Sequence, residues 1–282
     1  MKIKEVLRAL EQFAPLPLQE GFDNAGLQVG LTEAEVSGAL LCLDVTEKIV
    51  DEAVAKGCNL VVAHHPLIFR KLAQVSDANA VQRTVMKAIK NDVTIAALHT
   101  NIDNARGGVN FKIAEKMGLV EADFFGVRKT IQTLNDKGES VSVEGASGVM
   151  GTFEQPLAAD DFVILLKKTF DVECVMCNQL LRRPIRKVAI CGGSGAFLLT
   201  DAIAAGADAF VTGDIFYHTA HDIEETPLFL VDAGHHIEVV CRKQLAKWVN
   251  DWKEENNWDV TVIESETFTD PFEFYKAGEE NA

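Results

Sequence analysis

Residues 58–70 read Cys-Asn-Leu-Val-Val-Ala-His-His-Pro-Leu-Ile-Phe-Arg. The apolar run Leu60–Ala63 is too short for a helix and predicts a buried strand of a parallel sheet. Pro66 cannot continue a central strand, so the strand should end near His64 and His65. Because neighbouring strand residues point to opposite faces, both imidazoles can serve one site only if the backbone turns there.

This histidine pair has two interpretations. Open α/β sheets place their ligands at the carboxyl ends of strands, and imidazole is the commonest protein ligand for metal ions. On this interpretation, His64 and His65 are two metal ligands at the mouth of a strand. The alternative is a pair of histidines that hydrogen-bond to the backbone at the strand end.

An internal repeat favours the metal interpretation. A strand at 38–44, a helix at 46–57 and the histidine strand form a βαβ unit, and the same order recurs between residues 187 and 214. A shift of 149 positions places Cys42 on Cys191 and Val62 on Val211 without a gap. We therefore predict two related α/β domains, with mixed sheets and helices packed on them.

The second copy lacks the histidines. Under the same shift, His64 and His65 fall on Gly213 and Asp214. A residue that the scaffold required would be expected in both copies, so the pair is more consistent with a ligand role.

Length and charge limit the classes of function. At 282 residues, the chain has room for one large or two modest domains. Its formal charge of −15 argues against a general nucleic-acid binder. No apolar run reaches the roughly 18 residues of a membrane span, and residues 1–13 have the pattern of an amphipathic helix, not of a signal peptide. The six cysteines lack the spacing of a disulfide framework, so we expect reduced thiols and a cytoplasmic protein.

Two further strand ends carry the same types of side chain. A strand expected at 93–100 leads to His99 and Asp103, and a later one leads to His235, His236 and Glu238. Imidazoles combined with carboxylates suit zinc, iron, manganese or nickel, and a bridging carboxylate would suit two ions. Three strand ends thus predict a divalent metal site.

Other segments are less specific. We expect a helix at 81–89, short antiparallel strands within 130–153, a helix at 160–170 and a last strand at 260–263. The sequence Gly-Gly-Ser-Gly at 192–195 would suit either a phosphate cradle or a tight turn. The tryptophans Trp248, Trp252 and Trp258 suggest an interface, although at least one should pack onto its own domain.

An ordered set of motifs resembles the NIF3 family, also called GTP cyclohydrolase I type 2 homologues. The motifs lie between residues 21 and 238, in the order GFDNAGLQVG, VVAHHPLIF, LHTNIDNARGGVN, GGSG, TGDIFYH and DAGHHIE. The resemblance implies a metal-binding α/β domain at 1–128 plus 229–282, and a second related domain at 129–228. It also implies a ring-shaped homohexamer.

The resemblance implies a dinuclear site as well. Carried over to this sequence, its ligands are His64, His65, Asp103, His235 and Glu238. In many members the Glu follows the His by four residues, whereas here it follows His235 by three. Either His235 or His236 can therefore be the ligand; we favour His235 because it directly follows a glycine, as in the motif.

The implied activity is hydrolytic opening of the purine ring of GTP, with His99 as the residue that moves protons. Two alternatives use the same ligands. One is a two-metal phosphohydrolase that acts on nucleotides. The other is a non-catalytic, metal-binding scaffold or regulatory protein.

Overall fold

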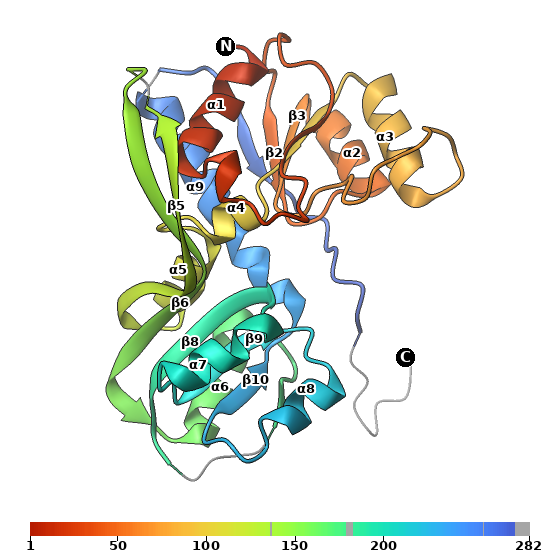
Figure 1. The fold of residues 1–282 in the computed structure, drawn as a ribbon. Coiled ribbons are helices and arrows are strands. Elements are labelled where there is room, and N and C mark those ends of the chain that lie inside the picture. The colour runs from red at the N-terminus through yellow and green to blue at the C-terminus, as the bar shows by residue number, and fades with distance from the viewer. Residues whose placement is uncertain (136, 179–182, 256, 274–282) are drawn as a thin grey trace. The chain divides into compact units, whose positions relative to one another are not determined.

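The computed structural model describes residues 1–135, 137–178, 183–255 and 257–273. It contains two mixed sheets with helices packed on them, as the sequence predicts (Figure 1). None of the helices in these ranges is long and apolar enough to cross a membrane.

The first sheet has five strands, of which the central three are parallel neighbours. In spatial order the strands are β1 (Gly26–Val29), β4 (Thr94–Ala97), β3 (Leu60–Ala63), β2 (Ala39–Cys42) and β11 (Val262–Glu264). Only β1 is antiparallel to its neighbour, whereas β11 extends the parallel part beside β2. Strands β2, β3 and β4 are buried along their whole length, which explains their apolar sequences, in which Thr94 is the one polar residue.

Helices complete this part of the molecule. They are α1 (Ile3–Phe13), η1 (Leu16–Leu18), α2 (Glu47–Ala55), α3 (Ala80–Lys90), α4 (Thr100–Asp103) and α9 (Val240–Glu255). The α2 helix begins where the side chain of Thr46 accepts a hydrogen bond from the backbone N–H of Ile49. Its apolar face packs into a core shared with β2, β3 and β4.

The second sheet has six strands, in the order β5 (Val120–Leu134), β6 (Ser140–Leu157), β8 (Ile185–Ser194), β9 (Ala209–Gly213), β10 (Phe229–Asp232) and β7 (Met176–Cys177). The accompanying helices are α5 (Val109–Lys116), α6 (Ala159–Phe170), η2 (Ala196–Leu198), α7 (Leu199–Ala204), α8 (Tyr217–Asp222) and η3 (His235–Val239).

The sequence prediction of short strands within 130–153 is wrong, because β5 and β6 are long strands. Glycines that resemble turn signals lie instead at close backbone contacts. A Cβ atom on Gly145 would lie 2.4 Å from the carbonyl oxygen of Asn104, and one on Gly148 would lie 2.7 Å from the ring of Phe125. These glycines allow dense packing within the strand and do not end it.

The predicted repeat is confirmed strand by strand. In the first copy, Leu40 pairs with Val61 in parallel register. In the second copy, Ala189 pairs with Phe210, and these residues correspond to the first pair under the shift of 149. The helical segment between the strands covers 47–55 in the first copy and 196–204 in the second. Both copies are parallel βαβ units with the same register.

The Gly-Gly-Ser-Gly segment forms a tight turn. The backbone N–H of Gly195 donates to the hydroxyl of Thr212 at 2.8 Å, and that hydroxyl donates to the carbonyl oxygen of Gly193 at 3.0 Å. A Cβ atom on Gly195 would lie 2.5 Å from the Cβ atom of Cys191. The Gly195 amide, which would face a phosphate in a cradle, is thus already paired with the protein.

The chain groups into two compact units. The first comprises 1–112, 127–147 and 238–267, and the second comprises 113–126, 148–237 and 268–282. The strands β5 and β6 contribute residues to both units. The domain ranges expected from the sequence, 1–128 plus 229–282 and 129–228, remain predictions.

Candidate metal centre

His64 and His65 follow directly after β3. Their backbone N–H groups donate to the carbonyl oxygen of Leu43, at 3.2 and 2.9 Å. The strand therefore ends at Ala63, and the two imidazoles come together on one side, with ring centroids 4.8 Å apart. This is the turn that the sequence requires for both rings to serve one site.

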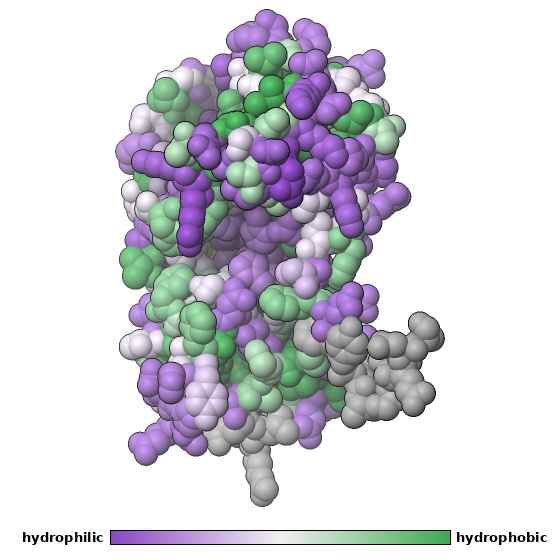
Figure 2. Space-filling model, turned by 90° about the vertical axis from the view of Figure 1, so that its right-hand side faces the viewer, coloured by the Kyte–Doolittle hydropathy of each residue, from purple (hydrophilic) through white to green (hydrophobic). Residues whose placement is uncertain are grey.

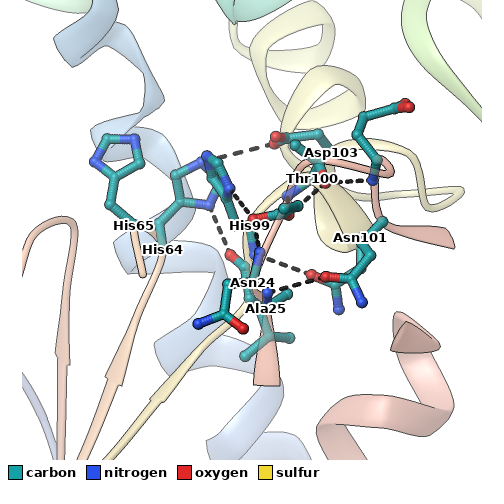
Figure 3. A network of polar contacts seen from close by, with 12 residues as sticks. Asn24, Ala25, His64, His65, His99, Thr100, Asn101 and Asp103 are labelled. Atoms are coloured by element: carbon teal, nitrogen blue, oxygen red, sulfur yellow. Dashed lines mark hydrogen bonds and ion pairs between the residues drawn. The ribbon is translucent and has the colours of Figure 1, made fainter. Parts of the chain in front are cut away.

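A third imidazole joins this pair. The ring of His99, at the end of the segment that follows β4, lies 5.4 Å from His64 and 5.6 Å from His65 between centroids. Figure 3 shows the three rings gathered beside Asp103. Ligand atoms of all three histidines lie within 4.8 Å of one another.

Each of these imidazoles is oriented through its Nδ1 atom. The partners are the carbonyl oxygen of Leu98 for His64 at 2.8 Å, Asp44 for His65 at 2.7 Å, and Asp23 for His99 at 2.7 Å. An acceptor at Nδ1 fixes the tautomer in which that nitrogen carries the proton, leaving Nε2 as the ligand atom.

Two carboxylates face the Nε2 atom of His64. An oxygen of Asp103 lies 3.7 Å away, and an oxygen of Glu238 lies 3.6 Å away. The same Glu238 oxygen lies 3.1 Å from Nε2 of His65. Asp103 is carried by α4 and Glu238 by η3, so segments far apart in the chain bring these carboxylates to the end of β3.

Buried amides hold the α4 segment in position. The side-chain N–H₂ of Asn101 donates to the carbonyl oxygen of Ala14, and that of Asn104 donates to the carbonyl oxygen of Leu18, both at 2.7 Å. The side-chain oxygen of Asn101 accepts the backbone N–H of His99 at 2.9 Å. These bonds hold His99 and Asp103 against the N-terminal segment.

Burial and neighbouring charge shift the proton equilibria of the site. Burial, followed by the charge of Glu238, raises the pKa of Asp103. Burial opposes the charged form of His65, but hydrogen bonds with Asp44 and Glu238 outweigh it and raise its pKa to about 10. Burial also disfavours ionised Asp23, yet hydrogen bonds from His99 and Thr100 lower its pKa to about 2. The carboxylates of Asp44 and Glu238 thus favour the protonated, positively charged form of His65.

The donor set fits a divalent metal ion. Nε2 of His64 and one oxygen of Asp103 are buried and have no hydrogen-bond partner, which is costly for such atoms unless a cation binds them. Ligand atoms of His64, Asp103 and Glu238 lie within 4.8 Å of one another. A cation between them would satisfy both unpaired atoms.

His235 and His236 belong to the second compact unit. Nδ1 of His235 lies 2.6 Å from a carboxylate oxygen of Asp214, an arrangement like those of His65 and His99. The ring of His236 packs instead against Phe268, with centroids 5.2 Å apart. His235 is thus oriented by a carboxylate at Nδ1, as His65 and His99 are.

Sequence reasoning did not assign roles to three acceptor residues, Asp23, Asp44 and Asp214. A signal for Asp44 was present, because it follows β2, which is the parallel neighbour of β3. Asp23 had no comparable signal, since it lies 76 residues from His99 in the chain. In the second copy of the repeat, Asp214 occupies the position that corresponds to His65 in the first copy.

Comparison with known proteins agrees with this architecture. A family model described as Duf34/NIF3 (NGG1p interacting factor 3) matches residues 1–271. A Clostridium perfringens protein named GTP cyclohydrolase 1 type 2 homolog is 34% identical over 275 residues, covering 97% of this chain and all of the relative. A protein of the same name from Streptococcus pneumoniae is 32% identical, covering 96% of this chain and 99% of the relative.

A solved structure extends the match to the fold. The Staphylococcus aureus hypothetical protein SA1388 superimposes with a TM-score of 0.89 at 29% sequence identity, covering 98% of this chain and 99% of the other. The chain is therefore a mixed α/β protein in which histidines and carboxylates cluster. Specifically, it is a member of the DUF34/NIF3 family.

Proposed function

We propose that the protein is a dinuclear metal-dependent hydrolase that opens the purine ring of GTP. The observation that carries the metal part is the buried pair of unsatisfied atoms, Nε2 of His64 and the oxygen of Asp103, facing Glu238. The purine part is supported by the names of the relatives from Clostridium perfringens and Streptococcus pneumoniae.

Charge balance supports two divalent ions, of zinc, iron, manganese or nickel. Four carboxylates lie within direct reach of the three imidazoles: Asp23, Asp44, Asp103 and Glu238. Two divalent cations would balance four negative charges and would replace the protons that now stabilise the site. A pair of ions lowers the pKa of a shared water molecule and thereby supplies a nucleophile near neutral pH.

The proposed ligands are His64, His65, Asp103, His235 and Glu238. The first three and Glu238 belong to the cluster described above. His235 joins them in this proposal because it lies in the same short helix as Glu238, η3, and because its Nδ1 is held by Asp214.

We assign proton transfer to His99. Its Nδ1 is held by Asp23, so Nε2 is the atom that would accept or donate a proton. Opening the imidazole ring of the purine at C8 consumes one water molecule, and release of C8 as formate consumes a second. Each step delivers a proton to the nitrogen that separates from C8, first as the ring opens and then as formate leaves, which is the task given to His99.

The test uses purified protein loaded in turn with zinc, iron, manganese or nickel and incubated with a panel of nucleoside triphosphates. The proposal predicts formate release from GTP, loss of that activity in His99→Ala, and unchanged metal content in the same variant. Phosphate release without formate would instead support a two-metal phosphohydrolase. Binding without turnover would support a metal-binding scaffold or regulatory protein.

The proposal places the enzyme in the cytoplasm as a ring-shaped homohexamer. The formal charge of −15 argues against general nucleic-acid binding. The upper part of the face in Figure 2 is mainly hydrophilic, with smaller apolar groups among the polar side chains.

A further inference from the structure

Two exposed phenylalanines adjoin the cluster of histidines. Phe22 is 67% exposed and Phe69 is 47% exposed. Their rings meet edge to face, with centroids 6.3 Å apart, and the ring of Phe69 lies 6.1 Å from that of His99 in the same manner. We call Phe22 and Phe69 the aromatic pair.

Hydrogen bonds fix the backbone on both sides of this pair. The side-chain N–H₂ of Asn24 donates to the carbonyl oxygen of Ile68 at 2.6 Å, which ties the loop of Phe22 to that of Phe69. The backbone N–H of Ile68 donates to the side chain of Gln28 at 3.1 Å. The two loops, 40 or more residues apart in the chain, thus form one unit.

The same loop also orients a site histidine. Asp23, directly after Phe22, binds Nδ1 of His99 and the backbone N–H of Thr100 at 2.7 and 3.0 Å. Figure 3 shows Asn24 and His99 within one polar network. Asp23 thus links the loop of Phe22 to the imidazole that Phe69 contacts.

Folding alone does not explain this exposure. Rings that serve the core are buried, as Phe162, Phe210 and Phe229 are. The contact of Phe69 with His99 places the pair at the edge of the histidine cluster, which favours a ligand of that site over a separate protein partner. A small planar ligand matches both the size of the surface and its contact with His99.

We propose that the aromatic pair is the specificity surface for the substrate, on which a planar heteroaromatic base stacks beside the metal centre. This inference rests on the proposed function, because it takes the substrate of that site to be a nucleotide. Stacking uses the π-face that every base has, so the surface selects for a base without distinguishing strongly between purines. Selectivity for guanine would have to come from other contacts.

The test compares two ligands that differ only in the base, 5′-GMP and ribose 5-phosphate, by calorimetry on zinc-loaded protein. Removing one ring, in Phe22→Leu or Phe69→Leu, should weaken GMP binding roughly 5- to 150-fold. Ribose 5-phosphate binding should stay within about twofold, because that ligand has nothing to stack. Phe69→Tyr retains a π-face and should restore most of the GMP affinity.

Phe197→Leu is the matched control, because Phe197 is 64% exposed but lies in η2 of the second unit. It should leave binding of both ligands unchanged. Equal weakening of GMP and ribose 5-phosphate in the Phe69 variant would overturn the inference, as would unchanged GMP binding or no measurable GMP binding to the wild type.

Formate assays on the same variants separate this inference from the proposed function. Formate release with a KM for GTP that is insensitive to both substitutions would refute the aromatic pair and leave the hydrolase intact. Ring-dependent GMP binding without formate release would refute the hydrolase and leave the aromatic pair intact.

Discussion

His65 and Asp44 occupy equivalent places just beyond the ends of two neighbouring strands, and Nδ1 of the imidazole lies 2.7 Å from the carboxylate. Cys42, the last residue of β2, pairs in parallel register with Ala63, the last residue of β3. Asp44 lies two residues after Cys42, and His65 lies two residues after Ala63. The sheet register therefore sets this contact, and Asp44 supports His65 without being part of the proposed ligand set.

Asp44→Asn should weaken metal binding by roughly 10- to 100-fold while the fold is retained, because the amide removes the charge that makes His65 a stronger ligand. Competition with a chromophoric chelator measures the affinity. Asp251→Asn is the control, since Asp251 forms its ion pair with Lys247 on the surface of α9. Equal affinity for wild type and Asp44→Asn would show that the contact does not tune the site.

The sequence was sufficient for the βαβ repeat and for the histidine pair, because both depend on short-range patterns. An apolar run that ends at a proline identifies the end of β3. The contact between Asp23 and His99 could not be predicted from short-range patterns. It depends on β1 pairing antiparallel with β4, and the sequence Gly-Leu-Gln-Val of β1 lies in a segment whose glycines and Asn24 are typical of turns.

Glu52 joins α2 to the segment after β11. Its carboxylate accepts hydrogen bonds from the hydroxyls of Ser265 and Thr267, at 2.6 and 2.7 Å, and from the backbone N–H of Glu266 at 2.9 Å. Burial disfavours its charge, but these bonds prevail and lower its pKa from 4.5 to about 2. The charged form is thus bound more strongly in the folded protein than in the unfolded chain.

A depressed pKa stabilises the fold above pH 4.5, and this stabilisation is lost as the pH falls toward about 2. Glu52→Gln should therefore lower the free energy of unfolding by about 1–3 kcal/mol at pH 7, and the difference from wild type should shrink below pH 4. Urea denaturation at several pH values measures both effects. Glu254→Gln, at an exposed position of α9, should change little; a Glu52 effect independent of pH would contradict the assignment.

His235 and His236 can be separated by single substitutions. His235→Ala should lower metal occupancy, because His235 is the histidine whose Nδ1 is held by Asp214. His236→Ala should retain it, since that ring packs against Phe268. Elemental analysis of the two purified variants decides between them. The reverse result would place the ligand at His236 and assign the contact with Asp214 a structural role.

Assembly into a hexamer predicts the mass of the protein in solution. Trp248 packs against Phe13 within its own unit, with ring centroids 4.0 Å apart, which confirms that at least one tryptophan serves its own domain. Trp252 and Trp258, both partly exposed, remain the candidates for an interface. A closed trimer of dimers of the 30.8 kDa chain would have a mass of about 185 kDa. Light scattering that gives a monomer at micromolar concentration, with metal bound, would refute the assembly.

The metal content of the purified protein tests the central claim most directly. Inductively coupled plasma mass spectrometry should find about two divalent ions per wild-type chain, and substantially less in His64→Ala and in Asp103→Ala. Circular dichroism should show that both variants remain folded, because neither side chain lies within a strand of the sheet. Unchanged metal content in both folded variants would contradict the site.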